Sequence, residues 1–136
     1  MVVVVVIGLL AALASAAIKR VQERSLASRM ANDFKQVAAA FQSYNLEHGA
    51  WPAATSTVGK VPAGMAGYLP AVFKQGSALG GGYTWSGSTA RLRLINVTNT
   101  TTDRIVKRVD AILDDGNLAT GDFTSVTSGG YHWQLH

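Results

Sequence analysis

The first 18 residues constrain this chain more than any other feature, because none of them is charged. The apolar run begins at Met1 and ends at Ile18, where Lys19 and Arg20 close it. As a helix it would be about 27 Å long, close to the roughly 30 Å hydrocarbon core of a bilayer. Its ten large aliphatic side chains would gain on the order of 15–30 kcal/mol on burial, as an upper bound. This exceeds the stability of an ordinary domain, so the segment must be covered by lipid, a protein core or other copies of itself.

Three interpretations of this segment compete. A cleavable secretory signal is the first, since Ala14-Ser15-Ala16 resembles a cleavage site, but no basic residue precedes the apolar run. A plain membrane anchor for a soluble head is the second. The third is a segment used twice, as a membrane anchor and then as the packed core of a filament, and the sequence after residue 18 favours it. The residues expected to line this membrane or filament-core helix are Val2, Val3, Val4, Val5, Val6, Ile7, Gly8, Leu9, Leu10 and Leu13.

Residues 19–48 are expected to continue the same helix as an amphipathic segment. No Gly or Pro lies between Leu9 and His48, and helix-forming residues dominate. Gly49 and Pro52 then predict a helix end near residue 48. Apolar side chains recur at steps of four, three, four and three, which places them on one helix face that we expect to dock on the head. They are Met30, Phe34, Val37, Phe41 and Tyr44.

Residues 49–136 are expected to form a globular head. The first part of the head is rich in Gly, Ala, Ser, Thr and Pro, a composition that favours turns and loops over regular elements. We expect surface loops at residues 49–82 and 116–130, with a short helical turn at residues 68–74. The expected parts of the whole chain are therefore residues 1–18, 19–48 and 49–136.

The regular elements of the head are expected to build a small antiparallel sheet. Residues 83–86 and 90–97, separated by Gly87-Ser88, predict a β-hairpin. Residues 102–113 predict a helix, and residues 131–135, where apolar and polar side chains alternate, predict a final strand. Three or four strands packed on the amphipathic half of the long helix would make an α+β fold.

The sequence offers little for catalysis, and we expect neither an enzyme nor a cofactor. Cysteine is absent, Gly80-Gly81-Gly82 lacks the residues that complete a phosphate-binding loop, and the three histidines have no metal-ligand spacing. We also expect no metal site. The nearest candidate is a Ca²⁺ site in the loop that holds Asp114, Asp115 and Asp122, for which a helix cap and a solvated turn are the simpler interpretation.

Two further surface features belong to the head. Asn96 and Asn99 each begin a glycosylation sequon, a pattern that is short and frequent. The chain has 12 Lys and Arg against 8 Asp and Glu, a small excess. The basic residues of the second expected strand and of the helix after it are more typical of solvated faces than of a nucleic-acid-binding stripe. They are Arg91, Arg93, Lys107 and Arg108.

The N-terminal run Met-Val-Val-Val-Val-Val-Ile-Gly-Leu-Leu-Ala-Ala-Leu-Ala resembles the N-terminal helix of type IV pilins and type II secretion pseudopilins. The tract Leu-Glu-His-Gly-Ala-Trp-Pro at residues 46–52 resembles the point where those helices end, with a Gly, an aromatic residue and a Pro. The order of parts, a long helix, a loop and a small antiparallel sheet, is similar as well.

The resemblance implies a structural subunit of a type IV pilus-like extracellular filament. Its partners would be other copies of the same chain, the inner-membrane assembly machinery and, before assembly, the membrane. The subunit would lie first in the bacterial inner membrane and later in a cell-surface filament. One alternative is a pseudopilin of a type II secretion system, whose usual major form has a Ca²⁺-holding loop and an Asp-Pro-Trp-Gly stretch that this chain lacks. The other is a monomeric membrane-anchored binding module.

Several features of that family have no counterpart in the sequence. They are a short basic leader, an aromatic first residue of the mature chain, a glutamate soon after it, and a pair of C-terminal cysteines. Ala16 stands where many pilins carry a helix proline. Aligning Gly8 with the glycine of the family helix places Met1 a few residues inside the mature chain. Either the sequence starts late, which we expect, or this copy has lost its processing signal.

Overall fold

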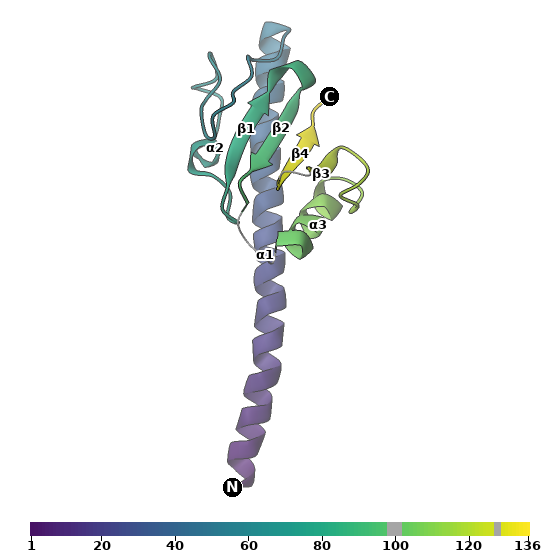
Figure 1. The fold of residues 1–136 in the computed structure, drawn as a ribbon. Coiled ribbons are helices and arrows are strands. Elements are labelled where there is room, and N and C mark those ends of the chain that lie inside the picture. The colour runs from purple at the N-terminus through teal and green to yellow at the C-terminus, as the bar shows by residue number, and fades with distance from the viewer. Residues whose placement is uncertain (98–101, 127–128) are drawn as a thin grey trace.

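The computed structural model of the chain describes residues 1–97, 102–126 and 129–136. Its head wraps the upper half of one long helix, whose lower half extends beyond the head as a bare rod (Figure 1). This arrangement confirms the α+β fold expected from the sequence, a long N-terminal helix packed on a small antiparallel sheet. The elements in order are α1 (Val2–His48), α2 (Ala71–Gln75), β1 (Gly82–Ser86), a 3-10 turn (Gly87–Thr89), β2 (Arg91–Ile95), α3 (Thr102–Leu113), β3 (Phe123–Val126) and β4 (Gly130–Gln134).

Helix α1 runs without interruption for 47 residues, which corresponds to about 70 Å. It ends where the sequence predicts. Gly49 adopts a left-handed conformation with φ 68°, and its amide N–H donates to the Asn45 carbonyl at 2.7 Å. Glycine takes this conformation without the steric cost that a Cβ atom brings. The chain then turns back along the helix into the head.

The four strands lie in the order β1-β2-β4-β3, and every neighbouring pair is antiparallel. The β1–β2 hairpin confirms the predicted pairing, with a 3-10 turn between the strands and Ala90 in a left-handed conformation at φ 46°. The prediction that residues 116–130 are all loop was wrong, because β3 lies inside that range. Only Phe123 of this strand is fully buried, so the sequence shows almost no alternation of apolar and polar residues there. The segment is a strand because it pairs with β4.

The core lies between the inner face of the sheet and one face of α1. The Phe34 ring meets the rings of Tyr83 and Phe123 edge-on, with centroids 5.4 and 5.3 Å away. The Phe41 ring stacks on Trp85 of β1 at 4.0 Å with an interplanar angle of 17°. Edge-on and stacked aromatic pairs add to the free energy gained from burial alone.

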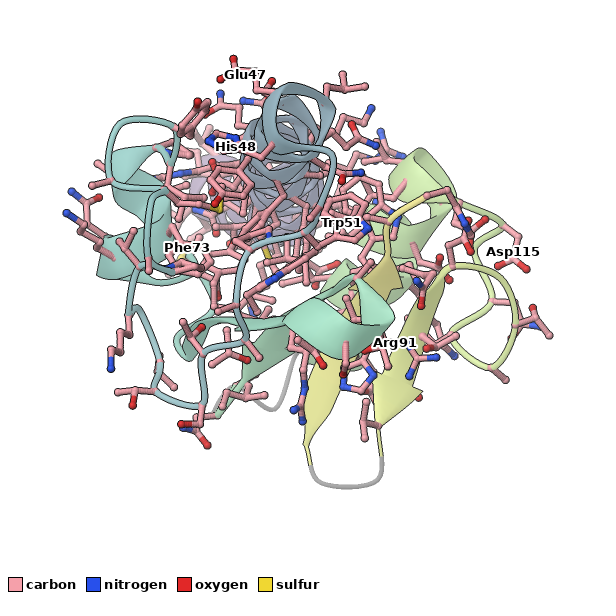
Figure 2. All side chains as sticks on the ribbon, turned by 90° about the horizontal axis from the view of Figure 1, so that it is seen from above. Glu47, His48, Trp51, Phe73, Arg91 and Asp115 are labelled. Carbon is pink, nitrogen blue, oxygen red and sulfur yellow. The ribbon has the colours of Figure 1, made fainter. Side chains whose placement is uncertain are left out.

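Helix α2 and the loop after α1 close this core from the side. Figure 2, which looks along α1 from its C-terminal end, places Phe73 and Trp51 near the helix and Arg91 and Asp115 toward the outer surface. Phe73 is fully buried and its ring lies 5.9 Å from that of Phe41. The short helical turn expected at residues 68–74 corresponds to α2, which starts three residues later and ends one residue later.

Helix α3 packs beside α1 at the base of the head, where the bare half of α1 begins (Figure 1). It starts at Thr102, as its sequence predicts. Ile105, Val106 and Val109 are buried, and their spacing puts them on one face of the helix. A salt bridge of 3.7 Å joins Arg104 to Glu23 of α1, so the two helices also meet at the lower edge of the head.

Candidate functional site

The most exposed apolar surface of the molecule is residues 2–18 of α1, which we call the shaft. Its ten large aliphatic side chains are exposed by between 49% and 77%. None of the most apolar 18-residue window of α1 is buried, and the first fully buried side chain of the helix belongs to Ala27. Soluble proteins normally expose large apolar residues singly rather than as one continuous surface. The shaft therefore needs a covering that the single chain does not supply.

The shaft is uniformly apolar. Ser15 carries its one polar side chain, and the Ser15 hydroxyl donates to the Ala11 carbonyl at 3.0 Å. Backbone groups inside a helix pair with one another, so almost no polar group of the shaft requires water. By length and composition, α1 can cross a membrane.

Small side chains in one part of the shaft allow a second helix to approach closely. A Cβ atom added at Gly8 would meet no atom within 4 Å, so no contact within the single chain requires glycine there. Glycine inside a helix costs about 1 kcal/mol relative to alanine. Gly8, Ala11, Ala12 and Ala14 together form a surface on which a second helix can pack closely, as small residues do between membrane helices.

The upper half of α1 fixes the shaft to the head. Tyr44, the last residue of the predicted docking face, is half-buried, and its ring stacks on His48 at 4.1 Å and meets Tyr68 edge-on at 5.7 Å. No Gly or Pro interrupts the helix between the shaft and this face, so the helix has no hinge residue there. The remaining residues of the face, each with 0% exposure, are Met30, Phe34, Val37 and Phe41.

The acidic loop after α3 holds itself closed through its own carboxylates. The Asp114 carboxylate accepts the amide N–H groups of Asp122 and Phe123. The Asp115 carboxylate accepts the Thr120 hydroxyl at 2.6 Å. This hydrogen bond is the main reason that the pKa of Asp115 lies below its usual value. The two carboxylates therefore stabilise the end of α3 and the turn that follows it.

Asp110 is a buried carboxylate that the sequence reasoning missed. It is 0% exposed, and within the described part of the chain neither carboxylate oxygen has a hydrogen-bond partner. One carboxylate oxygen from each of Asp110, Asp114 and Asp115 lies within 4.8 Å of the others. Burial, then the charges of Asp115 and Asp114, raise the pKa of Asp110 to about 6.

The structure therefore groups the acidic residues differently from the predicted Ca²⁺ set. Asp110 joins Asp114 and Asp115, whereas the Asp122 carboxylate lies 2.9 Å from Nε2 of His136. A signal for Asp110 is present in the sequence. Val106, Asp110 and Leu113 recur at steps of four and three, which places the carboxylate on the apolar face of α3.

The predicted basic residues do not form one patch. On β2, Arg91 Nε donates to Gln134 at 2.8 Å, and Arg93 Nε donates to His132 Nε2 at 2.9 Å across the outer face of the sheet. Burial and the Arg93 charge lower the pKa of His132. The other two basic residues, Lys107 and Arg108, belong to α3 beside α1.

One of the two predicted glycosylation sites can be placed. Asn96 is exposed just after β2 and adopts a left-handed conformation with φ 61°. Asn99, and the Thr98 that completes the first sequon, lie outside the described residues.

The chain matches no family model, no curated protein and no solved structure. Its function is therefore inferred from its own residues and geometry.

Proposed function

We propose that this chain is the structural subunit of a type IV pilus-like filament. The shaft is held by the inner membrane before assembly and by the shafts of other copies afterwards. The observation that supports this most directly is α1 itself. Its upper half is locked into the head by four fully buried side chains, and its lower half exposes an uncharged apolar surface.

The membrane stage follows from the dimensions of the shaft. The shaft, residues 2–18 of α1, spans about 26 Å, enough for most of a bilayer's hydrocarbon core. Lys19 and Arg20 end the apolar run at the height where a charged side chain reaches the polar surface of the membrane. The head then stands on the periplasmic side, tethered by the same helix that organises its core.

The filament stage replaces lipid with other shafts. Because lipid tails and a bundle of aliphatic side chains are similarly apolar, the hydrophobic effect changes little when a shaft moves between them. Close packing must therefore favour the assembled state. The small residues from Gly8 to Ala14 supply a surface for such packing, and their exposure in the single chain leaves that surface free.

The shape of the subunit suits a filament with its shafts at the centre. The shaft leaves the head along the axis of α1, and the sheet lies to one side of that axis (Figure 1). When shafts bundle in parallel, the heads form an outer layer. Arg91 and Arg93 lie on the face of the sheet that points away from α1, and this face would belong to the surface of the fibre.

Bulk at Gly8 tests the packing of shafts without adding charge. Gly8→Leu keeps the shaft apolar, and position 8 is exposed with open space around an added Cβ atom, so we expect normal amounts of protein in the membrane fraction. Fibres sheared from the cell surface should fall sharply, because the added side chain holds neighbouring helices apart. Gly8→Ala is the matched control, since it also raises helix propensity but stays small, and its fibre yield should stay near wild type.

Leu9→Asp is the more severe variant. A charge inside a bundle of aliphatic side chains is not compensated, so we expect no fibres from it. Fibres at wild-type yield from both Gly8→Leu and Leu9→Asp would overturn the proposal. The chain would then be a membrane-anchored module whose shaft stays in lipid.

A further inference from the structure

We propose that the groove between α1 and α3 binds the phosphate of an anionic phospholipid headgroup in the membrane that holds the shaft. The inference rests on the membrane stage of the proposed function and not on the filament stage. It assigns a ligand to the base of the head and a role to two arginines, Arg24 of α1 and Arg108 of α3.

The groove lies where the head meets the bare helix, and its volume is about 320 Å³. A salt bridge between Glu23 and Arg104 joins the two helices beside it, and the buried side chains of Ile105, Val106 and Val109 fix α3 to the core. The groove thus has walls from two different elements that the fold fixes relative to each other. The residues that line it are Arg24, Ala27, Ser28, Arg108, Ala111 and Ile112.

The end of the groove nearest the membrane, at Arg24, lies just above the headgroup layer, and Ala27 and Ser28 lie higher on α1. Arg24 lies six residues beyond Ile18, so its Cα atom is about 9 Å above the end of the shaft. The polar layer on each side of a bilayer is roughly 5–8 Å thick. Side chains of a helix tilt toward its N-terminus, which for α1 is the direction of the membrane. The guanidinium of Arg24 therefore reaches down into the layer that holds the lipid phosphates.

The charge of the groove is complementary to a phosphate. Within residues 1–97, 102–126 and 129–136, neither Arg24 nor Arg108 takes part in a salt bridge. Glu23, the acidic residue next to Arg24 in the sequence, already accepts Arg104. Guanidinium groups bind phosphate oxygens through paired N–H donors, and the hydroxyl of Ser28 adds a further donor to the same groove.

The apolar residues of the groove lie farther from the shaft than the two arginines do. Ala27 follows Arg24 on α1, and Ala111 and Ile112 follow Arg108 on α3, which runs away from the bare helix (Figure 1). A phospholipid offers a phosphate and, directly below it, a glycerol backbone and acyl chains. The two arginines would hold the phosphate at the end of the groove that faces the membrane.

The test compares amide hydrogen exchange of α3 in two kinds of nanodisc. The full chain is inserted either in phosphatidylcholine alone or in phosphatidylcholine with phosphatidylglycerol. A lipid that binds only the closed arrangement of α1 and α3 lowers the open population by a factor of 1 + [L]/Kd. At a lipid level about ten times its Kd, exchange of α3 should slow about tenfold in the anionic nanodiscs.

Charge-matched variants separate the groove from general attraction to an anionic surface. Arg24→Gln with Arg108→Gln should lose the slowing. Arg29→Gln with Lys107→Gln removes the same two charges from the same two helices outside the groove and should keep it. Arg24→Gln alone changes one exposed side chain. This single variant should also lose most of the slowing of amide exchange, and it replaces the double variant if the double variant does not fold.

Three results would overturn the proposal. They are no slowing in the wild-type chain, equal slowing in both double variants, and equal slowing when soluble glycerol phosphate is added to phosphatidylcholine nanodiscs. The last result would identify a free phosphate as the ligand. Because these measurements use the unassembled chain, a failure here leaves the fibre assay with Gly8→Leu unaffected, and a failure of that assay leaves this one unaffected.

Discussion

Phe41 gives the most direct measure of how firmly the head is fixed to the shaft. Its side chain is 0% exposed, its ring stacks on Trp85 at 4.0 Å, and the Phe73 ring lies 5.9 Å away at a tilt of 59°. Phe41→Ala would remove this ring and leave a cavity. Buried Phe→Ala substitutions cost about 3–5 kcal/mol, and the rigid aromatic neighbours of Phe41 leave little room for collapse.

The expected change is large enough to measure in the full chain. For a head and docked helix of about 110 residues, each kcal/mol shifts Tm by roughly 3–6 °C, so a cost of about 3–5 kcal/mol should lower the Tm of Phe41→Ala by roughly 9–30 °C. Thermal unfolding in detergent micelles can be followed by tryptophan fluorescence, since Trp85 and Trp51 lie beside the stack. Leu46→Ala is the matched control, because it removes an apolar side chain that is 86% exposed on the same helix, and its Tm should stay within about 2 °C of wild type. A Phe41→Ala protein that melts with the control would refute docking through this face.

Two further predictions concern the head. Asp110 has its pKa raised to about 6 in the folded chain, so the folded state binds more protons than the unfolded state between about pH 4 and pH 6. The contribution of Asp110 to stability should be fully present below this window and be lost as the pH rises through about 6. Asp110→Asn should remove that slope and stabilise the chain at neutral pH by up to about 3 kcal/mol in urea unfolding, and an unchanged slope would contradict the assignment. Gly81→Ala should destabilise the head more than Gly49→Ala, since both positions have positive φ but only at Gly81 would the new Cβ lie 2.3 Å from the Ile95 carbonyl oxygen; equal losses in urea unfolding would show that this contact relaxes freely.

The sequence predicts α1 well because helix-forming residues continue over a long stretch without a helix breaker. Forty residues without Gly or Pro between Leu9 and Gly49, followed by a left-handed glycine, leave few alternatives to a single helix. The apolar steps from Met30 to Phe41 identify the docking face for the same reason. In the head, the turn at Gly87-Ser88 between two short strand-like segments was enough to predict β1 and β2, and alternation was enough to predict β4.

What the sequence could not give depends on contacts between distant segments. β3 has Thr and Ser at its centre, and only pairing with β4 and insertion of Phe123 against Phe34 make it a strand. The grouping of Asp110 with Asp114 depends on how the loop after α3 folds back. The groove likewise needs Arg24 and Arg108 on neighbouring helices, and the sequence of neither helix indicates that the two arginines lie close together.

Cysteine labelling tests most directly whether the shaft leaves lipid and is buried among other shafts. The chain has no cysteine, so a single Leu10→Cys substitution provides one reporter in the shaft, and Gln42→Cys provides an exposed reporter on the head half of the same helix. In intact sheared fibres, a water-soluble maleimide should label Gln42→Cys and leave Leu10→Cys unmodified, and both should react once detergent separates the subunits. Equal labelling of the two positions in fibres, or the recovery of single membrane-bound chains without fibres, would contradict the account.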